Sequence, residues 1–164
     1  MEYSAYAKKK FEEICAAAPA NCCTVTEKGE TVALVGPSGG GKSTTADLIP
    51  RFYDATDGKV LIEGKDIKDY PLEQLRKKIG IVPQKAMLFT GTVADNLRWG
   101  NENATDEELV KAAEIAQAKE FIDKLPNGFD THINQGGRNL SGGQKQRLTI
   151  ARALTGKPEV LILD

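Results

Sequence analysis

A glycine-rich segment lies between an apolar run and a run typical of a helix, and it contains the residue types that bind phosphate. Its sequence, Gly36-Pro37-Ser38-Gly39-Gly40-Gly41-Lys42-Ser43, matches the pattern G-x-x-x-x-G-K-[ST] in full. Glycines let the backbone curl so that its N–H groups face phosphate oxygens, and the start of the next helix adds partial positive charge. We expect Lys42 to reach the β- and γ-phosphates of a nucleotide and Ser43 to ligate Mg²⁺. The alternative, an accidental glycine-rich turn, does not explain the flanking strand and helix.

A second segment could also accept an anion. It reads Leu140-Ser141-Gly142-Gly143-Gln144, in which two glycines follow a serine that can cap a helix predicted over residues 142–154. The N–H groups at the start of such a helix attract phosphate. A Ser-Gly-Gly sequence alone usually marks only a helix start, so its significance depends on the complete phosphate loop in the same chain.

The third segment combines a strand with a carboxylate. Residues 160–163 form a continuous apolar run that predicts a buried strand, and Asp164 follows directly. In open α/β sheets ligands bind at the carboxyl ends of the strands, where an aspartate can hold the Mg²⁺ shell of a nucleotide. Alone this is a common strand ending, but with a phosphate loop it becomes a specific pairing.

Alternating strands and helices would position these groups. The predicted strands cover residues 23–26, 31–35, 59–63, 79–83 and 160–163. The predicted helices cover residues 3–18, 72–78, 106–118, 120–125 and 142–154, and another begins at Lys42. Pro50 should end the helix that begins at Lys42, and a capping box of Thr105 and Glu108 opens the helix over residues 106–118. This pattern predicts an α/β domain with a parallel sheet.

The composition argues against several protein classes. The 164 residues suit one domain, and 22 basic and 23 acidic residues give a formal net charge of −1, so we expect no nucleic-acid partner. Three cysteines cannot build a disulfide framework, which favours a reducing compartment. No apolar run approaches the roughly 20 residues of a membrane helix. A secreted scaffold, a membrane-spanning chain and a disordered tail are therefore not expected.

Together these motifs resemble the nucleotide-binding domain of an ABC transporter. In the family's order, the similar segments are Gly36–Ser43 (Walker A), Gln84 within Ile81-Val82-Pro83-Gln84 (Q-loop), Leu140–Gln144 (signature) and Val160–Asp164 (Walker B). Within the family, the chain resembles the exporters in four segments: Arg51-Phe52-Tyr53-Asp54, Leu88–Val93, Asp95-Asn96-Leu97 and the linker-like helix Ser4–Ile14. The resemblance implies an α/β P-loop NTPase core of the RecA-like type, incomplete, with an ABC-type helical subdomain.

The resemblance also implies a domain organisation and ligands. It divides the chain into a linker-like helix (1–22), a partial ATPase core (23–84 and 155–164) and a helical subdomain (85–154). The implied ligands are ATP and Mg²⁺, and the implied nucleotide-binding residues are Gly36, Pro37, Ser38, Gly39, Gly40, Gly41, Lys42, Ser43 and Thr44. Lys42, Gln84 and Asp164 would be the catalytic residues. Ser43, Gln84 and Asp164 would hold the metal.

The implied partners are a second nucleotide-binding domain and a transmembrane domain. Leu140, Ser141, Gly142, Gly143 and Gln144 would contact ATP held by the other subunit of a head-to-tail dimer. Residues near Phe89–Asn96 would face the transmembrane domain, which would place the chain at the cytoplasmic face of a membrane. In a full protein, ATP hydrolysis would be coupled to transport.

Two departures from the family limit this interpretation. The strand that carries the adenine-stacking aromatic residue has no counterpart before Cys23, and Phe11 has the right spacing but a helical pattern. No glutamate follows Asp164, and the only histidine, His132, precedes the signature in a loop-like segment. We therefore expect a truncated ATPase fragment that binds Mg-ATP and is inactive alone.

Two alternatives remain open. One is an engineered or truncated structural fragment that binds nucleotide weakly or not at all and has no catalytic activity. The other is an ABC-type ATPase outside transport, such as a DNA-repair protein, and the exporter-like stretches argue against it. Nucleotide titration separates the first alternative from an ATP-binding domain.

Overall fold

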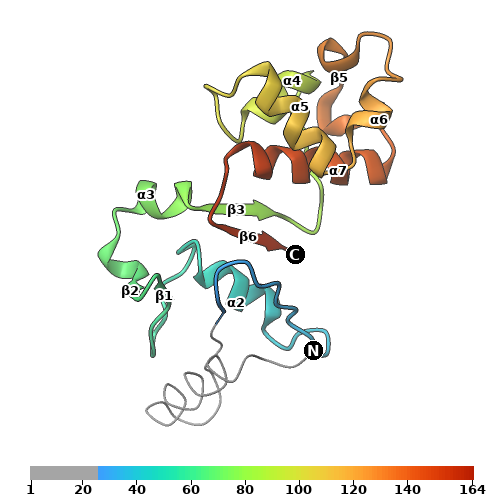
Figure 1. Ribbon diagram of the computed structural model, residues 1–164. Coiled ribbons are helices and arrows are strands. Elements are labelled where there is room, and N and C mark those ends of the chain that lie inside the picture. Colours follow the sequence, from blue (N-terminus) through green and yellow to red (C-terminus); the bar gives the residue numbers. More distant parts are fainter. Residues whose placement is uncertain (1–25) are drawn as a thin grey trace. The chain divides into compact units, whose positions relative to one another are not determined.

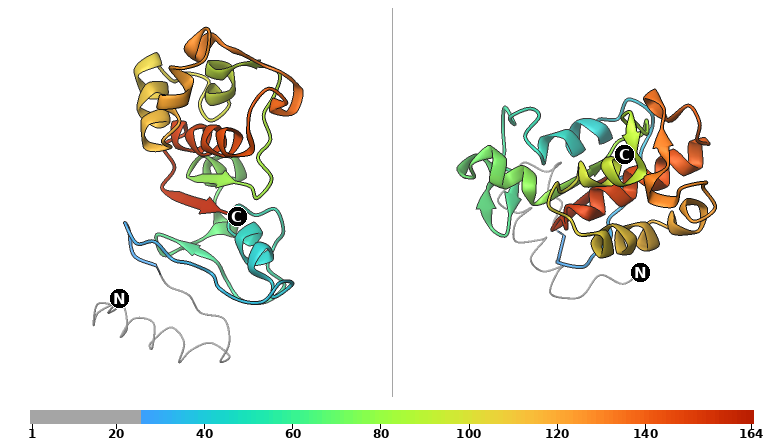
Figure 2. Two further views of the ribbon diagram at one scale, coloured as in Figure 1. Left: turned by 90° about the vertical axis from the view of Figure 1, so that its right-hand side faces the viewer. Right: turned by 90° about the horizontal axis from the view of Figure 1, so that it is seen from above.

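The structure is a computed structural model, and it describes residues 26–164 (Figure 1 and Figure 2). The chain divides into two compact units, Met1–Lys42 and Ser43–Asp164. The predicted helix over residues 3–18 and most of the predicted strand over residues 23–26 lie outside the described residues.

The described part of the first unit contains a turn and the phosphate loop. In the turn, the N–H of Glu30 donates to the carbonyl of Glu27 at 3.1 Å, and the N–H of Glu27 donates to Glu30 Oε2 at 2.9 Å. The prediction of a strand over residues 31–35 is wrong, because these residues are exposed and form no strand. β-branched residues favour a strand only where a partner takes up their backbone N–H and C=O groups, and residues 26–42 supply no such partner.

The second unit begins within a helix and continues as a small α/β layer. Its elements up to residue 82 are α2 (Lys42–Leu48), β1 (Leu61–Ile62), β2 (Lys65–Asp66), η1 (Ile67–Asp69), α3 (Leu72–Lys77) and β3 (Ile79–Val82). Helix α2 ends before Pro50, as predicted, and β1 is shorter than the predicted strand over residues 59–63. Strands β1 and β2 pair antiparallel, and Ile62, Ile67 and Leu75 form the buried centre of this part.

The strands β3 and β6 (Val160–Leu163) pair in parallel, from Ile79 opposite Val160 to Val82 opposite Leu163. The predicted strand at residues 160–163 is thus confirmed, but its complete burial is wrong. Val160 and Ile162 pack against the hydrophobic cluster of β3, whereas Leu161 and Leu163 are exposed. Successive side chains of a strand point to opposite faces, and only one face of β6 is covered in the described part of the chain.

Four helices form a second hydrophobic cluster. The elements between β3 and β6 are β4 (Gly91–Thr92), α4 (Val93–Arg98), α5 (Asp106–Ile115), α6 (Lys119–Ile122), η2 (Gly128–Asp130), β5 (His132–Ile133), η3 (Gln135–Gly137) and α7 (Gly142–Thr155). Helix α7 packs against α4 and α5 (Figure 1). The fully buried side chains at its centre include Leu97, Leu109, Ile122 and Leu148. The boundaries predicted for the helical subdomain remain a prediction.

The ends of these helices follow from local hydrogen bonds. The capping box of Thr105 and Glu108 opens α5 as predicted. Helix α5 ends at Ile115 rather than at residue 118, because Gln117 is left-handed (φ 55°) and the N–H of Ala118 returns to the carbonyl of Ala113 at 2.7 Å. Helix α6 is likewise shorter than the predicted helix over residues 120–125. His132 is exposed as expected, but it lies in the short strand β5.

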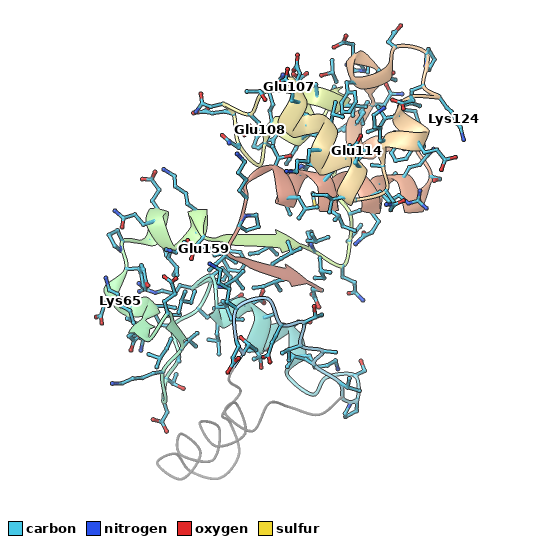
Figure 3. All side chains as sticks on the ribbon, viewed as in Figure 1. Lys65, Glu107, Glu108, Glu114, Lys124 and Glu159 are labelled. Carbon is cyan, nitrogen blue, oxygen red and sulfur yellow. The ribbon has the colours of Figure 1, made fainter. Side chains whose placement is uncertain are left out.

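Charged side chains cover the outside of the helical cluster. Glu114 of α5 and Lys124, which follows α6, are both exposed (Figure 3).

Within residues 26–164, no helix is both long enough and apolar enough to cross a lipid bilayer.

Candidate functional site

In the first unit, the side chain of Lys42 binds the backbone of the phosphate loop that precedes it. Lys42 Nζ donates to the carbonyl oxygens of Gly36 at 2.9 Å and Pro37 at 2.7 Å. The N–H of Gly40 donates to the carbonyl of Pro37 at 3.1 Å. These bonds place the ammonium charge of Lys42 against the loop backbone, where an anion held by the loop would meet it.

Two glycines of this loop occupy backbone conformations that other residues rarely adopt. Gly39 and Gly41 have φ values of 78° and 82°, in the left-handed region where a Cβ is strained. A Cβ at Gly40 would lie 3.1 Å from the carbonyl oxygen of Pro37. The local fold therefore requires the small residues that the sequence supplies, and a side chain here would open the loop.

The second unit brings together two residues from its two ends. Ser43, in the first turn of α2, donates from Oγ to Asp164 Oδ1 at 3.1 Å, across 121 positions of sequence. Asp164 follows β6 directly, and its N–H donates to the carbonyl of Val82 at 3.0 Å, which extends the pairing with β3. Both side chains are exposed. A hydroxyl and a carboxylate thus meet at the carboxyl edge of the parallel pair.

Gln84 belongs to the same edge of the sheet. It is exposed and lies in a bend two residues after the end of β3. Because β3 and β6 run parallel and in register to their ends, Gln84 and Asp164 both leave the sheet on its carboxyl side.

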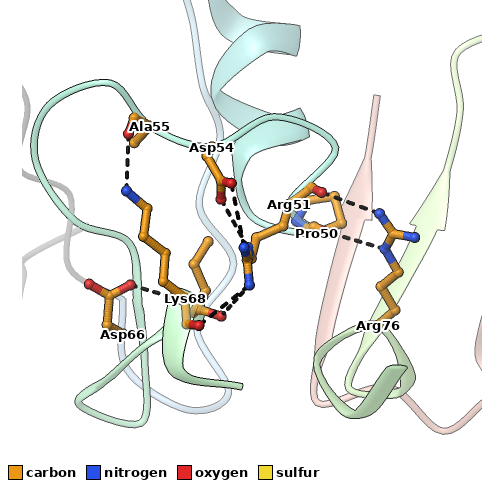
Figure 4. Close-up of polar contacts among 8 residues, drawn as sticks. Pro50, Arg51, Asp54, Ala55, Asp66, Lys68 and Arg76 are labelled. Carbon is orange, nitrogen blue, oxygen red and sulfur yellow. Dashed lines mark hydrogen bonds and ion pairs between the residues drawn. The ribbon is translucent and has the colours of Figure 1, made fainter. Parts of the chain in front are cut away.

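A cluster of arginines fixes the other end of α2 (Figure 4). Arg76 of α3 donates from Nε to the carbonyl of Pro50 and from Nη2 to that of Arg51, both at 3.2 Å. Arg51 in turn donates from Nε to Asp54 Oδ1 at 3.0 Å, and this bond lowers the pKa of the Asp54 carboxyl group below its usual value. The two bonds of Arg76 bind carbonyls of the turn that follows α2, and so hold the end of α2 on the α/β layer.

Only oxygen groups are available for a cation at this edge. Within residues 26–164, no group of three or more His, Cys, Asp or Glu side chains could hold a metal ion. Asp164 and Ser43 supply one carboxylate and one hydroxyl. Mg²⁺ is commonly bound by one or two protein oxygens together with phosphate oxygens and water. The donor set therefore fits Mg²⁺ that arrives with a phosphate ligand.

Helix α7 begins with a reciprocal cap. The N–H of Gln144 donates to Ser141 Oγ at 3.3 Å, and the N–H of Ser141 donates to Gln144 Oε1 at 2.9 Å, so the predicted cap is confirmed. Ser141, Gly142 and Gly143 are exposed. The Leu140 side chain packs into the hydrophobic cluster of the helices.

Nothing in the described chain requires glycine at positions 142 and 143. Neither has a positive φ, and a Cβ at either would meet no atom within 4 Å. Glycine in a helix costs up to about 1 kcal/mol relative to alanine. The two glycines therefore leave space beside the helix start at an expense to the stability of the helix.

An exposed group of apolar side chains lies on the segment after Gln84. Phe89 and Trp99 stack with ring centroids 4.4 Å apart, and they are 40% and 66% exposed. With the exposed Met87, they form what we call the aromatic patch. Sequence analysis identified the region near Phe89 but missed Trp99, although Trp99 is the only tryptophan of the chain.

Sequence analysis also missed Arg152. This side chain lies over the Phe89 ring, with Cζ 5.1 Å from the ring centroid. Burial lowers the pKa of its guanidinium below the usual value. Its hydrogen bonds reach the carbonyl of Met87 and both oxygens of Asn96. The sequence signal was a cation in the last turn of a helix, which usually indicates only a favourable interaction with the helix end.

Comparisons with known proteins agree on one family. The family model described as "ABC transporter" matches residues 22–164. Multidrug export ATP-binding/permease proteins, so named, of Staphylococcus aureus strains NCTC 8325 and COL are each 56% identical over 138 residues. Those matches cover 84% of this chain and 24% of each relative, so the chain spans about a quarter of their length.

A solved structure gives the same result. A bacterial Atm1-family ABC exporter with ATP bound matches with a TM-score of 0.74 and 45% identity, over 78% of this chain and 23% of the exporter chain. The α/β P-loop fold expected from the sequence motifs is therefore confirmed.

Proposed function

This chain belongs to the ABC transporter family, and we propose that it is the Mg-ATP-binding part of an exporter. The contact between Ser43 and Asp164 carries the proposal, because it brings together, within the second unit, the hydroxyl and the carboxylate expected to hold Mg²⁺. Relatives of which this chain spans about a quarter are named for multidrug export, which favours transport over an ATPase with another task.

Each group of the site has a separate part in this proposal. Lys42 would bind the β- and γ-phosphates, while the N–H groups of residues 36–44 would surround the phosphate oxygens. Ser43 and Asp164 would hold Mg²⁺, with Gln84 beside them, and bound Mg²⁺ neutralises phosphate charge. Lys42 and Ser43 are consecutive residues of α2, so the lysine and the hydroxyl are covalently fixed next to each other.

The start of α7 would serve a second nucleotide-binding domain. The uncrowded Gly142 and Gly143 would let a phosphate approach their own N–H groups in the first turn, beside the Gln144 N–H that Ser141 caps. We propose that Leu140–Gln144 contacts ATP held by the partner of a head-to-tail dimer. The space at both glycines, which the chain itself does not need, supports this assignment.

The aromatic patch would contact the transmembrane domain. Large apolar side chains grouped on a surface are typical of protein interfaces, and tryptophan is enriched where binding energy concentrates. The patch lies in the segment that resembles the exporter region facing that domain. Such docking would hold the chain at the cytoplasmic face of a membrane, where ATP hydrolysis in the whole transporter would drive export.

Titration of the chain with ATP, with and without Mg²⁺, tests the proposal. Lys42→Ala removes a charged partner of the phosphates, and loss of such a bond costs about 1.5–3 kcal/mol, or tenfold or more in affinity. Lys28→Ala is the matched control, because Lys28 is an exposed lysine in the same unit. We expect the control to bind as the wild type does.

Two results would overturn the proposal. ATP binding that survives Lys42→Ala unchanged would place the nucleotide elsewhere. An absence of ATP binding in the folded wild-type chain would favour the alternative of a structural fragment without a working nucleotide site.

A further inference from the structure

One side chain joins helix α7 to the aromatic patch. The guanidinium of Arg152 donates from Nη1 to the carbonyl of Met87 at 3.0 Å. It donates from Nε to the carbonyl of Asn96 at 2.9 Å and from Nη2 to Asn96 Oδ1 at 2.8 Å. Its plane also lies over Phe89. All three nitrogens of this α7 side chain thus bind the segment that carries the patch.

Asn96 extends these bonds to the backbone under the patch. Its side chain is 1% exposed, and Oδ1 accepts the N–H of Phe89 at 2.9 Å. Nδ2 donates to the carbonyls of Phe89 at 2.9 Å and Thr92 at 3.0 Å. Because the Phe89 ring stacks on Trp99, the position of Arg152 fixes the position of the exposed rings.

Close backbone packing adds a second connection. Gly100 follows Trp99, and a Cβ at Gly100 would lie 1.9 Å from the carbonyl oxygen of Arg152. A Cβ at Gly156, just beyond α7, would lie 3.1 Å from the carbonyl oxygen of Gly100. The chain after α4 therefore lies directly on the last turn of α7, beside the guanidinium contacts.

We propose that Arg152 is a positioning residue that makes the aromatic patch and helix α7 move as one body. A transmembrane domain seated on the patch would then set the position of Ser141–Gly143 at the opposite end of the same helix. The inference rests on the proposed function for the identity of that partner. Lysine could not replace Arg152, because an ammonium group lacks the planar fork that binds three acceptors at fixed angles.

A double-mutant cycle tests the connection in the folded chain. Amide hydrogen exchange of α7 is compared among wild type, Trp99→Ala, Arg152→Lys and the double variant. We expect Trp99→Ala to speed α7 exchange at least about twofold when Arg152 is present and to have no further effect with Arg152→Lys. A side chain that only added stability would give the same effect of Trp99→Ala in both backgrounds.

The matched control cycle replaces Arg152→Lys with Arg147→Lys. Arg147 lies on the same helix, but it is exposed and donates to the carbonyl of Gln117, away from the patch. We expect Trp99→Ala to act fully in that background. Additive effects in the Arg152 cycle, or no effect of Trp99→Ala in the wild type, would overturn the inference.

A second measurement leaves Arg152 unchanged, so it tests the connection between Arg152 and the aromatic patch even if the Arg152→Lys chain does not fold. Exchange of the Arg152 Nε–H proton should be faster in Trp99→Ala, whereas that of Arg98 Nε–H, which donates to Ala104, should not change. Unaltered exchange at Arg152 would contradict the proposal. Mg-ATP titration of the same chains separates the two conclusions, because failure to bind ATP would remove the proposed function while the exchange cycle still tests Arg152.

Discussion

Replacing Asn96 by alanine should destabilise the chain strongly. The buried amide makes four hydrogen bonds, of which three join neutral groups and one joins the guanidinium of Arg152. Neutral bonds contribute about 1 kcal/mol net and charged ones about 1.5–3 kcal/mol, which together set an upper limit near 6 kcal/mol. Because Phe89 is partly exposed and water can reach its backbone after the change, we expect a loss of about 2–4 kcal/mol in the free energy of unfolding.

Urea unfolding followed by circular dichroism measures this loss. A domain of this size has a free energy of unfolding of about 5–15 kcal/mol, so the midpoint should fall clearly. Asn103→Ala is the control, because Asn103 is exposed and its change should stay within about 0.5 kcal/mol. A loss below about 1 kcal/mol for Asn96→Ala would refute the reasoning, since it would mean that water replaces the four bonds at almost no cost.

Three further predictions concern the site and its surroundings. Asp164→Asn should weaken Mg-ATP binding about tenfold or more but leave Mg-free ATP binding nearly unchanged in calorimetric titrations; equal losses in both would contradict the assigned metal role. Gly143→Ala should raise the free energy of unfolding, measured by urea titration, by up to about 1 kcal/mol. A lower free energy of unfolding would instead show that the added methyl group meets a crowding contact. Bonds from the backbone N–H and then the hydroxyl of Thr92 lower the pKa of Asp95, so its contribution to stability is complete above its unfolded pKa and disappears as the pH falls through the lower folded value. Asp95→Asn should therefore reduce the acid dependence of unfolding, and an unchanged pH profile would count against the capping bond.

The sequence predicted the elements whose signals are local. Thr105 with Glu108 and Ser141 with Gln144 each determine a helix start within four residues, and both caps are present. Pro50 ends α2 through its own covalent geometry. The apolar runs at β3 and β6 also form strands, because their residues suit pairing as well as burial.

The errors concern properties that depend on distant partners. Residues 31–35 have the composition of a strand, but pairing depends on a neighbour that composition does not reveal. The exposure of Leu161 and Leu163 likewise depends on what covers the second face of β6. The end of α5 was misplaced because Gln117 adopts a left-handed conformation that its residue type does not favour.

The candidate site shows the same contrast. The pattern of Gly36–Ser43 alone predicts the loop that these residues form. The contact of Ser43 with Asp164 could be expected only by combining this pattern with the separate motif at residues 160–164. Arg152 was missed because its importance comes from contacts across 56 and 65 positions of sequence, between α7 and the segment of residues 87–100. Trp99 was missed because its stacking on Phe89 depends on how that segment folds. No residue pattern within either segment indicates that pairing.

The contact between Ser43 and Asp164 also has a consequence for the order in which the chain folds. It closes a loop of 121 positions, and the ion pair of Lys78 with Glu159, at the amino ends of β3 and β6, closes one of 81. Closing such loops costs conformational entropy before the contacts that offset it can form. The capped helices between residues 93 and 155, in contrast, form through contacts between residues close in sequence. We therefore expect the helical cluster to fold first, and the edge that we propose binds Mg²⁺ to assemble only when Asp164 reaches the sheet. During synthesis on a ribosome, the contact between Ser43 and Asp164 could form only after residues 44–164 had emerged.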